Sequence, residues 1–533
     1  MTTFTTPTKH DRPAGAHFAD LRPRHRAVLA RGSWRRVTHR IVCGLACALT
    51  VSSLLMPSIS LAAEWIDVGG TQYNAGTAAG DDAGTWSWDG ADDMKLNGYD
   101  GVAIQAEGKL NVSYSGNNTV TNENGRGILV MDGNAENAEL NIQGDASSTL
   151  NVTSSGDAIM SDGDINIDGA GTVDATSTEH DAIDAKGDLT IKGGGTVEAS
   201  SVEDVAIWAG GNIEISGGSQ VKASSEEDYA VKAIGGLTVT NASLNAHGVG
   251  YGVYAYKGIT LDHATVTVRA AAERDGVSAL FTDEDDIVIK NGSIVDAFAE
   301  GEFSTAISTR NYNPNEAGGH IYISDSVVKA IARYIETGGD GPDCYSGNQD
   351  GEITPERRGV NIGIFAQTSE GITPATISIV RSKVTAEGDT AAIFALAMSA
   401  DGKAIGTIEI EGAGILTPEG GKVIDYRHKE ELSDGTVYEA GQAIGTGDAV
   451  VDSPYDDAIA KRAVIAPSEE TKPEDSKPEG TKTTKTVATA TVGAKTVGKL
   501  AATGDTSGAT IVATALAGAA AIAAGAVASR KRS

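Results

Sequence analysis

Cysteine and positive charge are scarce in this chain of 533 residues. The three cysteines are Cys43, Cys47 and Cys344, and the first two lie in an apolar segment that we expect export to remove. The one that remains has no partner within the chain, which excludes a disulfide-stapled scaffold. Lys and Arg number 42 against 72 Asp and Glu, giving a net charge of −30. Such a charge argues against nucleic acid as a partner, because phosphates would be repelled.

Aromatic residues make up only 5% of the chain, whereas glycine occurs 66 times. Between Trp65 and Thr417 the sequence is rich in Val, Ile, Thr, Ala, Gly, Asn and Asp. This mixture is typical of short strands joined by tight turns.

The first 63 residues have the parts of a secretory signal peptide. Residues 1–40 are polar and basic, an apolar run begins at Ile41, and the small residues Ala62 and Ala63 offer a cleavage site. Charged, apolar and small-residue regions in this order predict export. The pair Arg35 and Arg36 fits twin-arginine export poorly, and an uncleaved amino-terminal anchor is the alternative.

A second targeting signal occupies residues 500–533. An apolar run at 509–528 has about the 20 residues that a bilayer span needs, and basic residues follow it. Before that run stands a five-residue motif, Leu500, Ala501, Ala502, Thr503 and Gly504. The arrangement resembles the sorting signals of sortase substrates, in the LAxTG variant of the LPxTG form. The resemblance implies cleavage after Thr503, with a sortase as partner and peptidoglycan as the covalent attachment; a plain membrane anchor is the alternative.

Residues 467–499 are Lys, Thr, Glu, Pro and Ala without apolar periodicity. Such a segment buries too little surface to fold. We therefore expect a disordered stalk that crosses the cell wall.

A repeat of about 24 residues fills the centre of the chain. Each unit has three short stretches of alternating apolar residues, which predict half-buried strands. No strand is large enough to stand alone, so we expect stacked coils around one core. Eleven units begin at Ala103, Gly127, Ala158, Ala182, Ala206, Ala230, Gly252, Gly276, Ala306, Gly363 and Ala392.

The predicted fold class is therefore all-β, a right-handed parallel β-helix over residues 103–417. Residues 64–102, which contain Trp86 and Trp88, are expected to cap its first coil, and residues 418–466 its last. The segment 333–360 is expected to be a loop leaving the stack.

Units such as residues 180–200 resemble the β-helical carbohydrate-binding domains of bacterial surface proteins, which are related in shape to pectate lyases. The resemblance implies that the chain binds polysaccharide, often acidic and sometimes with calcium.

Alternation places one column of side chains on the outside of the first strand of each unit. This column predicts a glycan-binding surface, because aromatic faces stack on sugars and Lys232 offers a charge for a carboxylate. The alternative is that the large residues only shield the sheet. The expected column is Met160, Asp184, Trp208, Lys232, Tyr254 and Ser278, with Asp184, Trp208, Lys232 and Tyr254 as the candidate binding residues.

Acidic residues cluster in the turn that closes each unit. Calcium prefers several carboxylate oxygens, so Asp181, Asp204 and Asp228 are candidate ligands, although an acidic solvated edge is the alternative. The outward column of the third strand alternates in charge and is interpreted as structural pairing. Its expected members are Asp174, Glu198, Lys222, Asn245, Arg269, Asp296 and Lys329.

Catalytic groups are sparse. Asp184 is the only acid in the first column, Lys232 is its only nearby base, and the nine histidines show no metal-ligand spacing. The sequence therefore predicts a non-catalytic, adhesin-like glycan-binding protein on the cell surface. A polysaccharide lyase or hydrolase and a structural envelope spacer are the alternatives.

Overall fold

The computed structural model describes residues 63–131, 138–272, 276–313, 317–335, 361–368, 372–389, 391–397 and 406–415, and five further strands between residues 422 and 467. These residues belong to the compact unit Met1–Pro467, and the second unit, Ser468–Ser533, lies outside them. The expected signal peptide, stalk, sorting motif and membrane helix, and most of the segment 333–360, also lie outside the described residues. Within the described ranges, no helix is long and apolar enough to cross a membrane.

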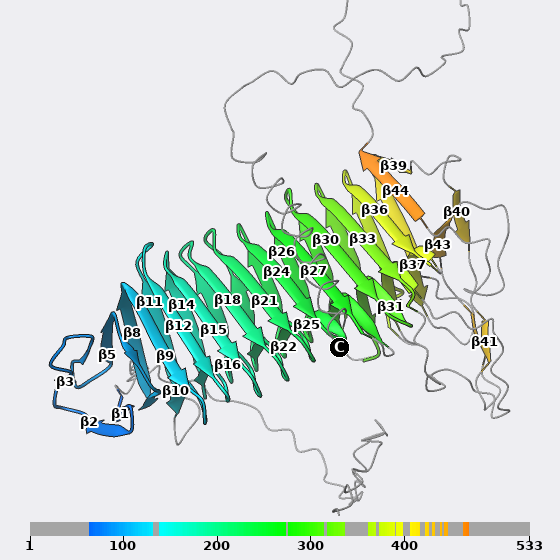
Figure 1. Cartoon of the computed structure of the whole chain (residues 1–533). Coiled ribbons are helices and arrows are strands. Elements are labelled where there is room, and N and C mark those ends of the chain that lie inside the picture. Colours follow the sequence, from blue (N-terminus) through cyan, green and yellow to red (C-terminus); the bar gives the residue numbers. More distant parts are fainter. Residues whose placement is uncertain are drawn as a thin grey trace, which may run out of the picture. The chain divides into compact units, whose positions relative to one another are not determined.

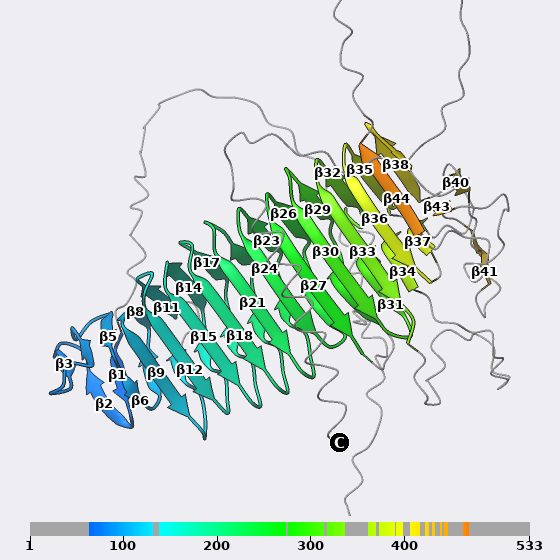
Figure 2. The same ribbon diagram turned by 45° about the horizontal axis from the view of Figure 1, so that its top comes forward.

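The described elements are strands that stack into a parallel β-helix (Figures 1 and 2). Each full coil contributes one strand to each of three long sheets. Figure 1 shows successive coils side by side, with the colour changing steadily along the stack.

The first sheet has 15 strands. In spatial order they are β2 (Thr71–Asn74), β1 (Trp65–Val68), β7 (Ile104–Glu107), β10 (Ile128–Met131), β13 (Ile159–Ser161), β16 (Ile183–Ala185), β19 (Ile207–Ala209), β22 (Val231–Ala233), β25 (Tyr251–Ala255), β28 (Val277–Thr282), β31 (Ser304–Asn311), β34 (Asn361–Thr368), β37 (Ala391–Ala397), β43 (Gln442–Gly445) and β40 (Lys422–Asp425).

The second sheet has 14 strands. They are β3 (Ala79–Gly80), β4 (Trp86–Trp88), β5 (Asp93–Asn97), β8 (Lys109–Ser115), β11 (Glu139–Gly144), β14 (Asp164–Gly169), β17 (Leu189–Lys192), β20 (Ile213–Ile215), β23 (Leu237–Thr240), β26 (Ile259–Asp262), β29 (Ile287–Lys290), β32 (Ile321–Ser324), β35 (Thr376–Val380) and β38 (Thr407–Glu411).

The third sheet has 13 strands, and a separate hairpin pairs β41 (Lys429–Glu431) with β42 (Val437–Glu439). The 13 are β39 (Ala413–Ile415), β44 (Arg462–Pro467), β36 (Lys383–Gly388), β33 (Val327–Arg333), β30 (Ile294–Glu300), β27 (Thr265–Ala271), β24 (Ser243–Gly248), β21 (Gln220–Ser225), β18 (Thr196–Ser201), β15 (Thr172–Ser177), β12 (Thr149–Ser154), β9 (Asn117–Asn122) and β6 (Asp100–Gly101).

Small and branched apolar side chains fill the interior of the coil. Alternation predicted six inward residues in the coil that begins at Ala182, and each is at most 2% exposed: Ile183, Ala185, Leu189, Ile191, Val197 and Ala199. Each also lies beside its counterpart in the coils before and after it, so the core is continuous along the stack. Stacking is thus what buries strands too short to be stable alone.

The coils turn sharply between the second and third sheets. In two coils a pair of glycines with positive φ makes this turn, Gly193–Gly194 and Gly217–Gly218. In five later coils one non-glycine residue takes the left-handed conformation at the same place, which L-residues adopt at a cost of about 1–2 kcal/mol. These residues are Asn241, His263, Asn291, Asp325 and Arg381.

Antiparallel strands lie at the ends of the stack. At the start, β1 pairs antiparallel with β2 and β7, and β4, whose Trp88 is 1% exposed, pairs antiparallel with β3 and β5. At the other end, β43 pairs antiparallel with β37 and β40, and β44 with β36 and β39. Parallel stacking therefore stops in each of these pairs.

The first sheet contains eleven mutually parallel strands, β7 to β37, which matches the eleven predicted units. Ten of the predicted starts are in register, but the start at Gly276 is wrong. Leu280 pairs with Val253 of the previous coil, so this unit starts at Ala279. The cause is that every residue of β28 is buried, so alternation could not distinguish Val277 from Leu280.

The predicted column of the third strand is also corrected at one position. Asn245 is followed by Thr267, which in turn pairs with Asp296, whereas Arg269 pairs with His247 and Phe298. Arg269 still reaches Asp296 diagonally, with 3.0 Å between Nη2 and Oδ2. Lys222 pairs with Glu198 in the same column, and such half-exposed pairs stabilise the fold by about 0–1 kcal/mol each.

Candidate functional site

Two columns of outward side chains run side by side on the first sheet. Column one consists of Asp184, Trp208, Lys232, Tyr254 and Phe281, one from each successive coil. The four predicted binding residues therefore lie in consecutive coils, while Ser278, predicted as the next member, pairs with Tyr251 instead.

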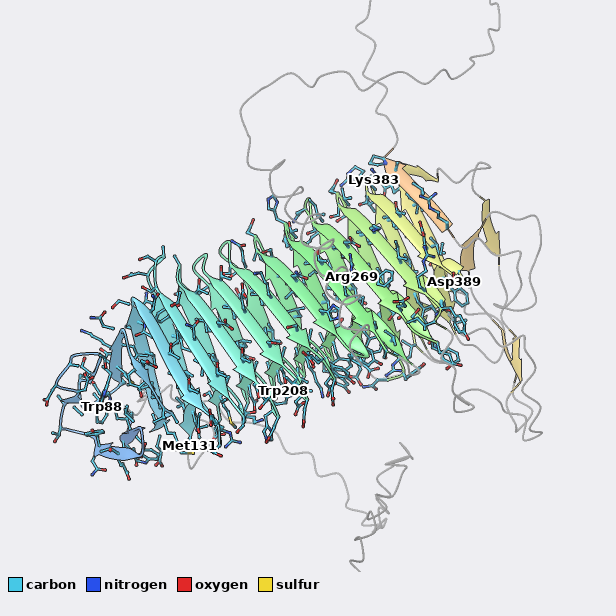
Figure 3. The ribbon with its side chains drawn as sticks, viewed as in Figure 1. Trp88, Met131, Trp208, Arg269, Lys383 and Asp389 are labelled. Carbon is cyan, nitrogen blue, oxygen red and sulfur yellow. The ribbon has the colours of Figure 1, made fainter. Side chains whose placement is uncertain are left out.

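Column two lies next to column one. In each coil, its residue comes three positions before the column-one residue in the sequence. Its members are Asp157, Asp181, Val205, Tyr229 and Tyr251, as the backbone hydrogen bonds between coils show. Figure 3 labels Trp208, which lies on the outside of the stack along the side where β16 and β22 are labelled in Figure 1.

Serines in the corner between the third and first sheets set the position of column two. Ser177 Oγ donates to the carbonyl of Gly156, one coil back, and accepts the N–H of His180. Ser201 repeats both contacts one coil later, with His180 and Asp204. These hydrogen bonds fix the backbone at the corner of each of the two coils. The column-two residue, which follows the corner, therefore keeps the same position from one coil to the next.

Four aromatic rings from three coils form one cluster. Tyr251 lies 4.8 Å from Tyr229, 5.7 Å from Tyr254 and 5.1 Å from Phe281, measured between ring centroids. The rings of Tyr229 and Tyr254 are stacked at 6.0 Å. All but Phe281 are partly exposed. Of these four rings, the alternation of the sequence predicted only Tyr254 as a binding residue.

Cationic groups lie against these rings. Lys186 Nζ is 4.4 Å from the centroid of Trp208, and Lys232 Nζ is 5.3 Å from that of Tyr229. The guanidinium of Arg310 lies 4.9 Å from Phe281 and also pairs with Asp283, with 2.7 Å between Nε and Oδ1. Cation–π contacts hold each of these charges beside an aromatic face.

Tyr254 is anchored at its hydroxyl, which lies 3.3 Å from Asp283 Oδ2. Burial, the negative charge of Asp283 and this hydrogen bond raise the pKa of Tyr254, so its hydroxyl stays protonated at neutral pH. The residue therefore offers a neutral, fixed ring.

Asp184 is a charged residue that is only 3% exposed. Its Oδ2 accepts from Lys186 Nζ at 2.6 Å, so Lys186, two residues on in the same coil, is its basic partner. The predicted pairing with Lys232 is wrong, because Lys232 lies over Tyr229. The other carboxylate oxygen, Oδ1, is buried and accepts no hydrogen bond.

The predicted grouping of Asp181, Asp204 and Asp228 is also wrong. Asp204 comes one position too early in its coil to stack on Asp181, so Val205 is the neighbour of Asp181 in column two. The carboxylates of Asp204 and Asp228 instead accept the N–H of the residue that follows each, at 2.9 and 2.8 Å. They cap their own turns.

Asp181 lies instead with Asp157 and Asp184. One carboxylate oxygen from each of the three falls within 4.8 Å of the others. Burial, followed by the negative charges of Asp204, Asp184 and Asp157, raises the pKa of Asp181 to about 8. The signal in the sequence was the Asp-Ala-Ile run at Asp157, which recurs a whole repeat later at Asp181.

No family model, no curated protein and no solved structure matches this chain. Functional inference therefore depends on the arrangement of the residues themselves.

Proposed function

We propose that this protein is an exported, wall-anchored and non-catalytic adhesin-like protein, whose right-handed β-helix binds polysaccharide or a host glycan. The observation that supports the proposal is the row of partly exposed aromatic rings, interleaved with cations, along columns one and two. On the described outward face of the second sheet, the ring contact is the single pair His320 and Tyr322.

The spacing of the rings suits a glycan laid along the stack. Trp208 and Tyr254 are two coils apart, which is about 10 Å at the usual strand separation. This distance is close to the repeat of a disaccharide in a β-linked chain. Lys232 lies in the coil between them and would meet a carboxylate on an acidic sugar.

A glycan array with the full-length chain tests the proposal. Trp208→Ala and Tyr254→Ala are each expected to weaken binding at least tenfold, because loss of an aromatic stacking face removes about 1–2 kcal/mol or more. The matched control is Tyr322→Ala, which removes a tyrosine that is 38% exposed on the second sheet.

The outcomes separate the alternatives. Absence of glycan binding by the wild-type chain would leave the structural spacer as the better account. Shortened or unsaturated products from incubation with polygalacturonate would replace the binding function with a lyase or hydrolase. Equal loss in the Tyr322→Ala variant would place the glycan elsewhere.

Export and anchoring complete the proposal. The signal-peptide pattern of residues 1–63 and the motif Leu500–Gly504 support it. Sortase is then the processing partner, and peptidoglycan carries the chain through Thr503.

A further inference from the structure

Beyond glycan binding, the acidic cluster formed by Asp157, Asp181 and Asp184 has the features of a cation site. Asp157 and Asp181 occupy column two in adjacent coils, and Asp184 lies on β16 in column one. The repeat of the coil thus brings together three carboxylates from two coils at one corner.

Only two of the three carboxyl groups in the cluster pair with a cation. Arg126 Nε lies 2.7 Å from Asp157 Oδ2, and Lys186 Nζ lies 2.6 Å from Asp184 Oδ2. Two cations face three carboxylates, and the side chains of Asp157 and Asp184 are only 6% and 4% exposed. The two paired carboxylates are therefore held in place and largely shielded from water.

One carboxylate oxygen within the cluster has no hydrogen-bond partner. Asp184 Oδ1 is buried without a hydrogen-bond donor, although the other oxygen of that carboxylate is paired. Unsatisfied buried acceptors are rare in folded proteins and indicate a missing partner. This observation is independent of the clustering of the acids.

The spacing of the carboxylates would allow one ion to contact all three, and an all-oxygen ligand set is the kind that calcium prefers. Calcium binds oxygens at about 2.3–2.6 Å, so two oxygens on one ion are at most about 5 Å apart. The three carboxylate oxygens lie within 4.8 Å of one another and satisfy that limit. Calcium takes 6–8 oxygens, so waters and backbone carbonyls would complete the shell.

We infer that Asp157, Asp181 and Asp184 bind one calcium ion, which ties two adjacent coils together at the start of the aromatic columns. The site does not depend on glycan binding, and its success or failure is measured separately.

Calorimetric titration of the metal-free, full-length chain with CaCl₂ tests the inference. We expect one site in the wild-type chain and at least tenfold weaker binding in both Asp184→Asn and Asp157→Asn. Two variants are used because each aspartate also pairs with a cation, and circular dichroism in a chelator confirms that each is folded. Asp228→Asn, in the equivalent turn but outside the cluster, is the matched control and is expected to bind normally.

Terbium luminescence locates the ion. Trp208 follows Asp184 in column one, and Lys186 Nζ contacts both Asp184 and the Trp208 ring. Excitation of tryptophan should therefore sensitise bound Tb³⁺ in the wild-type chain. Trp208→Phe should lose most of this emission while the calcium affinity stays within twofold.

Three results would overturn the inference. One is the absence of saturable calcium binding up to millimolar concentrations. A second is binding that persists in both Asp184→Asn and Asp157→Asn. A third is equal weakening by Asp228→Asn or by Asp92→Asn, which alters the exposed acidic group of Asp89, Asp92 and Asp93.

Discussion

The pKa of Asp181 is raised partly because the repeat places other acidic residues beside it. Its counterpart one coil earlier is another aspartate, and the carboxylates of Asp184 and Asp204 add to the same field. Arg126 and Lys186 are the cations that face the group. Because the folded-state pKa of about 8 exceeds the ordinary value of 3.8, the folded protein retains a proton that the unfolded chain releases.

The stability of the metal-free protein should therefore fall as pH rises from about 4 to about 8, since the folded state binds more protons over that window. Asp181→Asn should remove part of this loss and raise Tm at pH 8 relative to the wild type. Thermal melts in a chelator at pH 5 and pH 8 measure the effect. Glu179→Gln, an exposed acid in the same turn, should leave the pH dependence unchanged.

The repeat spacing of the sequence predicted the column-one residues but not the acidic cluster. Asp184, Trp208, Lys232 and Tyr254 lie in one column because each is separated by a whole repeat. The acidic cluster was missed because a single-residue offset moves a side chain to a different place. Asp204 stops one position short of a whole repeat from Asp181, whereas Asp157 precedes Asp181 by a whole repeat.

Individual strands are stable only through their neighbours. β19 has three residues and hydrogen-bonded strands on both sides, and its Ile207 is 1% exposed between Ile183 and Val231. Ile207→Ala should leave a cavity in the continuous core and lower the free energy of unfolding by about 2–5 kcal/mol. Denaturant unfolding measures the change.

Thr190→Ala is the control for this prediction, because Thr190 points outward from β17 between Asn166 and Glu214. A change within about 0.5 kcal/mol is expected there. Equal effects of the two substitutions would contradict an interior at Ile207.

Alternation predicted strands best where one face is solvated. It succeeded for β17 and β18, whose outward residues are polar and at least partly exposed, and failed for β28, where every residue is buried. Aromatic and aliphatic side chains cover both faces of that strand, so the period of two disappears. Tyr229 and Tyr251 also lie a whole repeat apart, directly before the unit starts Ala230 and Gly252, but alternation within the first strand did not extend to this corner position.

At the scale of the whole molecule, the solenoid is expected to be presented outside the cell. In a bacterial host whose sortase accepts the LAxTG form, wild-type chain should be released by peptidoglycan hydrolase, attached to wall fragments. Thr503→Ala should shift the chain to the membrane fraction, because in the proposed anchoring the carbonyl of Thr503 would form the bond to the wall. Fractionation followed by immunoblotting measures the distribution.

Thr506→Ala, two residues beyond the motif, is expected to be anchored like the wild type. Release of the Thr503→Ala chain by peptidoglycan hydrolase would contradict covalent attachment at this residue.

Strand direction reverses at several of the sheet ends, and this affects whether copies of the chain can add to one another end to end. An open parallel edge repeats the pattern of the coil before it and would accept the first coil of another copy, so that chains could polymerise end to end. The antiparallel strands β1 and β4 at one end and β43 and β44 at the other present a different hydrogen-bonding pattern. They oppose the addition of another copy at these sheet edges, whereas β6 in the third sheet and β38 in the second are terminal strands that continue the stack without a reversed partner.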